Sequence, residues 1–310
     1  MKIFRGYKGI RLRDPVVSMG IFDGVHLGHR AILNYLVSRS FELNCESAVV
    51  TFQPHPRLVL DKGASDLAFL NTLEEKQQLL EKSGIDNLVV VEFTKEFSKI
   101  KACDFVEKIL AGQLGTREIV VGHDHHFGHR GEGNFNTIKE CAGKLGIGVI
   151  QMEGYMESGK VISSSLIRDA LVNGNLTDAN RWLGYDYFLS GTIIEGKKLG
   201  RKLGFPTANI KPSDDNKLVP ASGVYAVDIN IDNKKYSGML SIGYNPTIRK
   251  IKDTRSVEVN IFDFDMNIYG KEIEVIFRHR LRDEQKFTGV KELVRQMKSD
   301  RENACNLLKR

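Results

Sequence analysis

The 310-residue chain lacks the segments that would place it in a membrane or outside the cell. No apolar run reaches the roughly 18 residues that a membrane-spanning helix needs. The basic beginning, MKIFRGYKGIRLRD, has no apolar core of a secretion signal. The four cysteines are scattered and form no CxxC pair: Cys45, Cys103, Cys141 and Cys305. Neither a disulfide framework nor a zinc site is predicted from them, and a cytoplasmic protein that contacts no membrane is expected.

Proline is also scarce, and the sequence contains no internal repeat and no stretch of low complexity. With 7 prolines, 41% hydrophobic and 27% charged residues, the composition is that of an ordinary globular protein. A length of 310 residues is more than one domain usually needs, so two domains are expected.

The excess of basic residues gives a net charge of +6 and a pI near 9.0. Nucleic acid, an anionic surface or phosphorylated small molecules would each fit this charge. The lysines and arginines are spread along the chain and are not gathered into one basic stripe. Small phosphorylated substrates are therefore favoured, and no nucleic-acid partner is expected.

Between residues 16 and 150, short β-branched runs alternate with amphipathic segments. The runs VVSM (16–19) and SAVVTF (47–52), for example, flank a helix predicted over 30–41, and another helix is predicted over 102–114. Such alternation predicts a parallel sheet with helices on both faces. Ligands of these sheets bind beyond the carboxyl ends of the strands.

After a short helix predicted at 163–173, the sequence from about residue 185 is rich in short strands. No helical period interrupts them until residues 289–308. This pattern predicts an antiparallel barrel that ends in an amphipathic helix. The fold class is therefore α/β plus β, with domains at 1–183 and 184–310.

The first candidate site is the segment GIFDGVHLGH at residues 20–29, which follows a predicted strand and opens a predicted helix. Its glycines let the backbone approach a nucleotide, and the helix begins with unpaired amides. His26 and His29 on the first turn can donate hydrogen bonds to phosphate oxygens. A fragment of a metal site is the alternative for a histidine pair at this spacing.

Two further motifs lie at predicted strand ends. In TFQPHP (51–56), His55 lies between two prolines that hold the loop in shape. A rigid turn without a ligand is the alternative interpretation of this motif. VGHDHHFGHRGEGN (121–134) combines Asp124 with four histidines and several glycines. Zinc is an alternative here, but histidines on one loop rarely converge on an ion without a carboxylate or thiolate.

A fourth motif, ISSSLIR at 162–168, opens a helix with consecutive hydroxyl groups. Ser164 is an ordinary choice for a helix N-cap. Together with Arg168 and the helix amides, its hydroxyl can also hold a triphosphate.

These four motifs, in this order, resemble those of the FMN adenylyltransferase module of bacterial bifunctional riboflavin kinase/FAD synthetases, within the nucleotidyltransferase superfamily. The resemblance implies a Rossmann-like domain that joins ATP and FMN into FAD and pyrophosphate by in-line attack, without a covalent enzyme intermediate. It implies that ATP is bound by Gly20, Phe22, Asp23, His26, His29, Ser164 and Arg168, of which His26, His29 and Arg168 take part in catalysis. It places His55 and Asp124 on the FMN side; His125 stands where the family often has an aromatic residue.

The second half of the chain contains GKKLGRKLGFPTANI at residues 196–210, a glycine-rich and basic segment. It lacks the GxxxxGK[ST] order of a P-loop and suits a mobile basic loop as well. Thr207 and Asn209 share one face of an extended segment, and their hard oxygen atoms suit Mg²⁺. Glu258, in mid-strand, is either part of a solvated face or a general base in a polar site.

LGFPTANI, GVYAV, SIGYNPTI, SVEVNIFDFDMNIYG and LRDEQKFTGVKEL resemble the successive signatures of the riboflavin kinase module. The resemblance implies transfer of the ATP γ-phosphate to the ribityl hydroxyl of riboflavin, with Glu258 as the base. It implies ATP binding by Gly196, Gly200, Lys202, Gly204, Thr207 and Asn209, with Mg²⁺ at Thr207 and Asn209. Arg282 and Phe287 fall on the flavin side, and Asn260 stands where some relatives have histidine.

The sequence therefore predicts a two-step flavin cofactor synthase that uses ATP, Mg²⁺, riboflavin and FMN, and it leaves self-association open. Two alternatives remain. One is a nucleotidyltransferase for another phosphorylated substrate, such as a pantetheine or nicotinate mononucleotide type, which would leave the second half without a purpose. The other is a basic nucleic-acid-binding protein, which would show a steep loss of affinity with salt.

Overall fold

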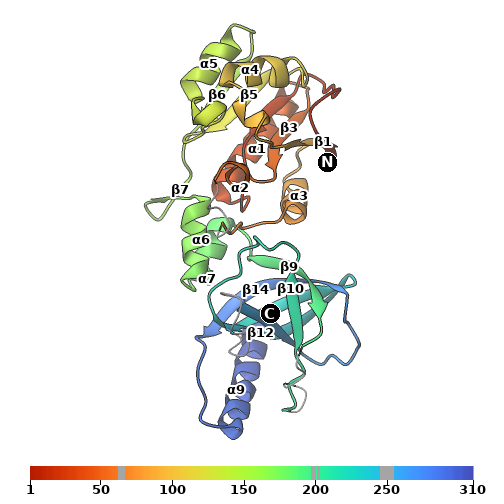
Figure 1. Cartoon of the computed structure of the whole chain (residues 1–310). Coiled ribbons are helices and arrows are strands. Elements are labelled where there is room, and N and C mark those ends of the chain that lie inside the picture. Colours follow the sequence, from red (N-terminus) through yellow and green to blue (C-terminus); the bar gives the residue numbers. More distant parts are fainter. Residues whose placement is uncertain (62–66, 197–199, 201–202, 245–254, 310) are drawn as a thin grey trace. The chain divides into compact units, whose positions relative to one another are not determined.

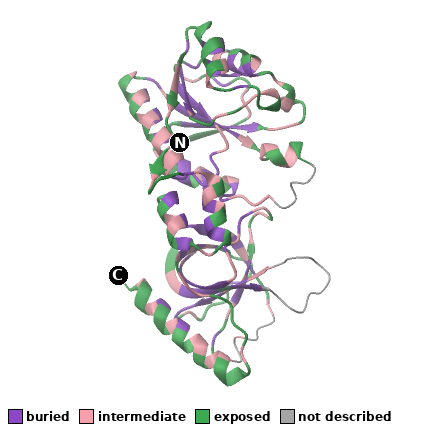
Figure 2. Ribbon diagram, turned by 90° about the vertical axis from the view of Figure 1, so that its left-hand side faces the viewer, coloured by how far each residue is buried: buried purple, intermediate pink, exposed green. Residues whose placement is uncertain are grey.

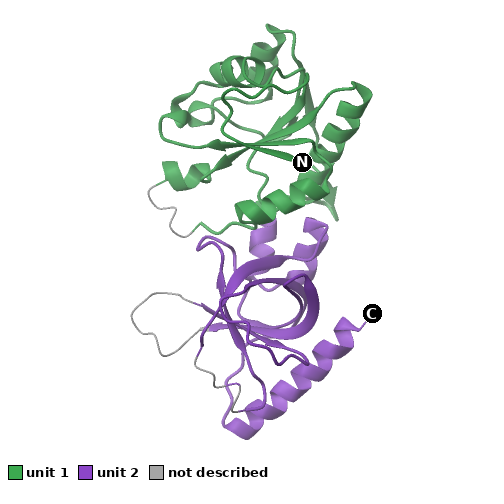
Figure 3. Cartoon of the chain, turned by 90° about the vertical axis from the view of Figure 1, so that its right-hand side faces the viewer, with its two compact units in different colours: residues 1–164 green, residues 165–310 purple. Residues whose placement is uncertain are grey.

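Two units divide the chain, Met1–Ser164 and Ser165–Arg310 (Figure 3). The computed structural model describes residues 1–61, 67–196, 200, 203–244 and 255–309. Within them, no helix combines the length and the apolar character needed to cross a membrane.

Unit 1 is built on a six-stranded parallel sheet, as its alternating pattern predicts. The strands are β1 (Lys2–Arg5), β2 (Val16–Met19), β3 (Ser47–Gln53), β4 (Asn87–Glu92), β5 (Glu118–Gly122) and β6 (Gly148–Met152). The spatial order is β1-β4-β3-β2-β5-β6, so the order of strands reverses at β2. In such sheets ligands bind beyond the carboxyl ends of the strands at this switch point.

The helices of unit 1 connect these strands (Figure 1). They are α1 (Leu27–Glu42), α2 (Pro56–Leu60), α3 (Leu73–Lys82), α4 (Ala102–Asp104), α5 (Phe135–Gly143) and the short turns η2 (Phe97–Lys99) and η4 (His129–Gly131). The helix predicted over 102–114 begins at Ala102, but from Phe105 to Ala111 it continues as a π-helix, η3. A small hairpin, β7 (Met156–Glu157) and β8 (Lys160–Val161), precedes the end of the unit.

One pair of cysteines forms a disulfide, although the scattered spacing of the cysteines predicted no disulfide framework. Cys103 of α4 and Cys141 of α5 form a disulfide, with 5.4 Å between their Cα atoms. The packing of α4 against α5 brings together two residues that are 38 positions apart in the sequence. Cys45 and Cys305 are free thiols.

Unit 2 contains a closed antiparallel barrel of six strands, which confirms the predicted architecture. The strands are β9 (Phe188–Ile194), β10 (Ala208–Pro212), β11 (Gly223–Ile231), β12 (Lys234–Tyr244), β13 (Arg255–Ile261) and β14 (Glu272–Arg282), in the spatial order β10-β13-β12-β11-β14-β9. Many residues of the barrel strands are buried, for example most of β11, and Figure 2 shows these parts of the ribbon in purple. The aromatic rings of Tyr187, Tyr225 and Phe277 meet in this interior.

Helices cover parts of the barrel. The final helix α9 (Val290–Leu308) packs on β11 and β12, where Ala304 joins a cluster with Phe205, Ala226 and Met239. The helix α7 (Leu176–Leu183), which follows α6 (Ser164–Val172), also attaches to the barrel, because the Asn180 side chain donates to the carbonyl of Phe277. The structural division falls between Ser164 and Ser165, at the start of α6. The boundary between 1–183 and 184–310 stays a prediction about how the two activities divide.

Candidate functional site

The loop after β2 has a strained backbone at the point where the sheet order reverses. Phe22, Gly24 and Val25 all have positive φ angles, of 52°, 84° and 36°. A β-branched residue such as Val25 rarely adopts this conformation, which persists only where surrounding contacts enforce it. Phe22 and Val25 are both buried, and the amide of Gly20 donates to the carbonyl of Val50 on β3. The loop is thus held in one shape before any ligand binds.

Asp23 is the residue that ties this loop to its surroundings. Its carboxylate accepts hydrogen bonds from the amides of Leu70 and Asn71, at 2.9 and 3.2 Å. The hydroxyl of Ser164 donates to the Asp23 carbonyl at 2.8 Å. The structure therefore brings the first and the fourth sequence motif together through hydrogen bonds.

Replacing Asp23 with alanine is expected to destabilise unit 1. The substitution leaves two buried amides without their charged acceptor, which costs about 2 to 4 kcal/mol of unfolding free energy. Hydrogen exchange of the unit 1 strands at increasing denaturant concentration measures this loss of unfolding free energy. The exposed Glu107 of the same unit supplies the control, since Glu107→Ala removes a carboxylate that faces solvent. Equal stability of Asp23→Ala and wild type would contradict this role.

His26 and His29 stack on one another at the start of α1, with 3.7 Å between ring centroids. His26 caps the helix, because its Nδ1 accepts a hydrogen bond from the His29 amide at 3.4 Å. Burial, His26 and Lys76 together hold the pKa of His29 well below its usual value, so this imidazole is neutral at pH 7. The first turn of α1 carries no acidic residue, so the helix end favours an anion.

The residues predicted on the FMN side lie on two other strand ends. His55 caps α2 through its Nδ1, which accepts from the Arg57 amide, and its ring stacks on Phe69 at 4.7 Å. Asp124 follows β5 and is exposed. Burial lowers the pKa of the adjacent His125 to about 4, and that ring stacks on Phe127. In the described part of the chain, no three or more His, Cys, Asp or Glu residues are placed to hold a metal ion.

Arg168 lies on α6, beyond the division between the units. Its guanidinium donates to the hydroxyl of Ser165 at 3.3 Å. Its predicted action on the ATP phosphates stays a prediction.

In unit 2, residues from several distant segments line one cavity of about 350 Å³. Glu258 comes from β13, and Arg282 from the end of β14. The wall is completed by Gly200, Leu203, Thr207, Val224, Met239, Leu240, Ser241, Asn260, Glu284, Gln285, Phe287, Leu293, Met297 and Asp300. Five of the predicted kinase residues therefore line the same space: Gly200, Thr207, Glu258, Arg282 and Phe287. Its apolar side chains suit a flat aromatic ligand.

The oxygen atoms of this site converge at the β10–β13 pair. The Thr207 hydroxyl donates to the Glu258 carboxylate at 3.3 Å, and Asn209 lies opposite Glu258 in the strand register. Glu258 is half-buried at the cavity wall and does not belong to a solvated face. Hydroxyl, amide and carboxylate oxygens together form the hard donor set that Mg²⁺ prefers.

Two of the predicted glycines are packed directly against Asn209 and Thr207. A Cβ atom on Gly196 would lie 1.9 Å from Nδ2 of Asn209, and one on Gly200 would lie 2.2 Å from the carbonyl of Phe205 and 3.2 Å from the Thr207 hydroxyl. Gly204 has a φ of +81°. Lys202 lies outside the described residues.

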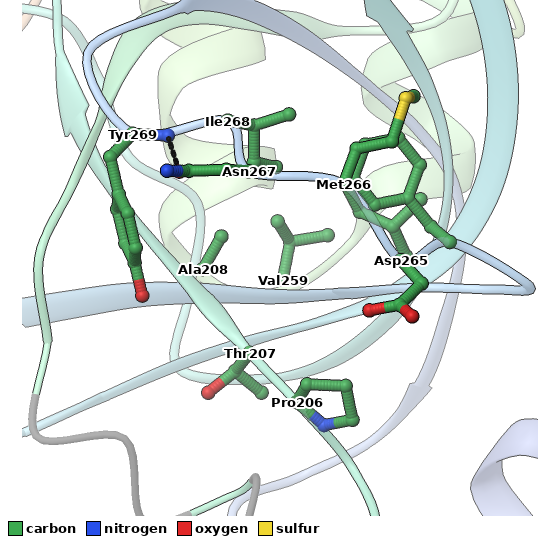
Figure 4. A pocket seen from close by; sticks show the side chains of 11 residues that line it. Pro206, Thr207, Ala208, Val259, Asp265, Met266, Asn267, Ile268 and Tyr269 are labelled. Atoms are coloured by element: carbon green, nitrogen blue, oxygen red, sulfur yellow. Dashed lines mark hydrogen bonds between the residues drawn. The ribbon is translucent and has the colours of Figure 1, made fainter.

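Thr207 also lines a second cavity, of about 680 Å³ (Figure 4). Its far wall is the segment Phe264–Tyr269, where the Tyr269 amide donates to the Asn267 side chain. Pro206, Ala208 and Val259 form the near wall. Thr207 therefore lines both of these cavities.

Residues of α9 hold the side chain of Arg282 in place. Its guanidinium makes a bidentate pair with the buried carboxylate of Asp300, and Gln296 donates to the same carboxylate. The Phe287 ring lies 5.8 Å from the Arg282 guanidinium. The other face of the cavity is supported by Asn260, whose side chain donates to the Pro206 carbonyl at 2.7 Å.

Sequence reasoning missed Asp300 and Lys76, two charged residues that the structure buries. Both occur on the apolar face of an amphipathic helix: Lys76 precedes Leu79 and Leu80 by three and four positions, and Asp300 precedes Ala304 by four. A charge at such a position is the signal that identifies them.

Known proteins resemble the chain over its whole length. The sequence model of the FAD synthetase family matches residues 10–166, and that of riboflavin kinase matches residues 183–308. A "Bifunctional riboflavin kinase/FMN adenylyltransferase" of Listeria monocytogenes is 38% identical over 94% of this chain and 91% of its own. The Bacillus subtilis protein of the same name is also 38% identical, over 93% and 91%. A crystal structure described as a macrolide-efflux protein from Streptococcus pneumoniae matches with a TM-score of 0.89 and 30% identity, over 99% of both chains.

Proposed function

The chain belongs to the family of bifunctional riboflavin kinase/FMN adenylyltransferases, and we propose from this premise which of its residues carry each reaction. It is a transferase with two activities. The C-terminal domain phosphorylates riboflavin with ATP to give FMN, and the N-terminal domain joins FMN and a second ATP into FAD and pyrophosphate. The observation that best supports the assignment of residues is the cavity where Thr207, Glu258, Arg282 and Phe287 meet.

In the kinase reaction, Glu258 is the general base. Its carboxylate borders the cavity and accepts the proton of the ribityl hydroxyl as that oxygen attacks the γ-phosphorus of ATP. The bond between the γ-phosphorus and the bridging oxygen breaks, and ADP leaves. Riboflavin occupies the smaller, apolar cavity with its ring beside Phe287. The adenosine part of ATP occupies the larger cavity, so that the phosphates pass Thr207.

Magnesium fits the residues at the junction of these cavities. Thr207 and Asn209, next to Glu258, would hold the ion together with the ATP phosphates. When bound, Mg²⁺ supplies charge stabilisation to the transferring phosphoryl group. Gly196 and Gly200 allow the backbone to lie close to Asn209 and Thr207, and Gly204 allows the positive φ of +81° that precedes this segment.

In the adenylyltransferase reaction, the phosphates of ATP lie at the amino end of α1. His26, His29, Ser164 and Arg168 position them and stabilise the charge that develops on the leaving pyrophosphate. The backbone of Gly20, Phe22 and Asp23 is held beside them by its own hydrogen bonds. His55 and Asp124, at the neighbouring strand ends, orient FMN for attack on the α-phosphorus.

The partners that this function needs are small molecules: ATP, riboflavin and FMN. We propose a cytoplasmic enzyme that requires neither a membrane nor nucleic acid. Incubation of the purified protein with riboflavin, ATP and Mg²⁺, followed by chromatography, tests the function: FMN is expected first and FAD after it. A product mixture without FMN would contradict the kinase activity, and FMN without FAD would contradict the second step.

Gly196→Ala is expected to impair the kinase and spare the second reaction. The added methyl group would overlap the side-chain amide of Asn209 at 1.9 Å, so this amide has to move from the position beside Gly196 that it now occupies. A misplacement of this size lowers kcat/KM by about 10²-fold. Gly270→Ala is a matched control in the same unit, because a Cβ atom there meets no neighbour, although its φ of +77° adds some strain. Wild-type FMN production by Gly196→Ala would show that Asn209 is not held this closely.

A further inference from the structure

Lys76 is a buried cation without an ion pair in unit 1. Only 5% of its surface is exposed. No described carboxylate forms an ion pair with it, and burial lowers its pKa to about 8, with a partial compensation from Asp23. A buried ammonium group in this situation is unfavourable for the fold unless a binding partner compensates it.

The helix that carries Lys76, α3, is held against the loop after β2 that contains Asp23. Thr72 and Glu75 form a capping box at the start of α3, and Glu75 is fully buried. The two residues before this cap, Leu70 and Asn71, donate their amides to the Asp23 carboxylate. Lys76 lies in the first turns of α3. Because these hydrogen bonds fix the start of α3 at Asp23, they also fix the position of Lys76 relative to Asp23.

The ionisable groups that interact electrostatically with Lys76 come from the loop after β2 and from the start of α1. They are Asp23, which favours the ammonium form, and His29, whose pKa is lowered in part by the positive charge of Lys76. The Nδ1 atom of His29 is buried and has no hydrogen-bond partner within the described chain. A cation and an unsatisfied imidazole thus lie together at the end of α1 that favours an anion.

We propose that Lys76 is a further ATP-binding residue of the adenylyltransferase site, where its ammonium group pairs with a phosphate oxygen next to His29. The triphosphate compensates the buried positive charge of Lys76, which Asp23 offsets only in part in the free protein. Lys76 also keeps His29 neutral, so that the imidazole binds by hydrogen bonding while the lysine supplies the charge. This inference rests on the function proposed above.

Lys76→Met tests the proposal, since it removes the charge and keeps the length of the side chain. The KM for ATP in the conversion of FMN to FAD is expected to rise roughly tenfold or more, which is the effect of losing one charge-assisted hydrogen bond. The KM for FMN should stay within about twofold, because Lys76 does not contact FMN. Hydrogen exchange of the unit 1 strands without ATP should be as slow as in wild type or slower, since an apolar side chain replaces a desolvated charge.

Two variants complete the experiment. Lys76→Arg keeps the positive charge and should keep the KM for ATP within about threefold. Lys82→Met removes an exposed lysine from the same helix and should match wild type in every measurement. Conversion of riboflavin to FMN by the other domain is followed in each variant as an internal control.

Three results would overturn the proposal. These are a Lys76→Met protein that loses its fold or its exchange protection, one that retains the wild-type KM for ATP, and a Lys76→Arg protein as impaired as Lys76→Met. The first would make Lys76 a structural residue, and the other two would show that its charge does not bind ATP. Failure of the wild-type protein to form FAD would refute the proposed function, and that result is distinct from all three.

Discussion

Glu258→Gln is expected to lower the conversion of riboflavin to FMN by about 10²- to 10⁴-fold, the usual contribution of a general base. Glutamine has the shape of glutamate, so the Thr207 contact and the register with Asn209 remain. Its amide, however, cannot take the proton from the ribityl hydroxyl. Chromatography of flavins after incubation with riboflavin, ATP and Mg²⁺ measures the loss. FMN supplied directly should still be converted to FAD at the wild-type rate.

The control for this variant comes from the same barrel. Glu272 begins β14 and is exposed, so Glu272→Gln removes a carboxylate from the surface and leaves both cavities unchanged. It is expected to form FMN and FAD as wild type does. A folded Glu258→Gln protein that forms FMN at the wild-type rate would exclude Glu258 as the base. Loss of both activities would instead point to a general defect of the chain.

The strands and their two architectures follow from local patterns in the sequence. VVSM, for instance, becomes β2 with the bounds that its β-branched run predicts, and its four residues are buried because both faces of a parallel sheet are covered. The alternation around Glu258 likewise predicts buried Val257 and Val259 beside a polar face. Patterns of this kind depend only on neighbours in the chain, and a sequence displays them directly.

The features that the sequence did not reveal depend on packing between distant segments. Asn209 and Glu258 become neighbours only because the barrel closes with β10 next to β13. The pairing of Cys103 with Cys141 depends on the approach of two helices in the same way. The positive φ of Val25 runs against the preference of a β-branched residue, and it is maintained by a loop that Asp23 anchors.

His29→Ala is expected to slow the conversion of FMN to FAD by about 10²-fold or more, the effect of removing one donor that stabilises the developing charge. The kinase reaction should continue, so that FMN accumulates from riboflavin. His279→Ala in the barrel, which removes an exposed imidazole, is the control and should leave FAD formation unchanged. If His29→Ala formed FAD at the wild-type rate, the phosphates could not lie at this end of α1.

The protonation state of His29 gives this prediction a second, independent measurement. Burial, His26 and Lys76 lower its pKa, so the imidazole stays neutral as the pH falls from 8 to 6, through the range where a free histidine takes up a proton. His29→Asn supplies a neutral donor in its place and should recover part of the activity lost in His29→Ala. The rates of wild type and His29→Asn should therefore change in parallel between pH 6 and 8. If the rate of the wild type alone changed with pH in this range, His29 would bind the phosphates as a cation. The stacked pair with His26 would then have to separate when ATP binds.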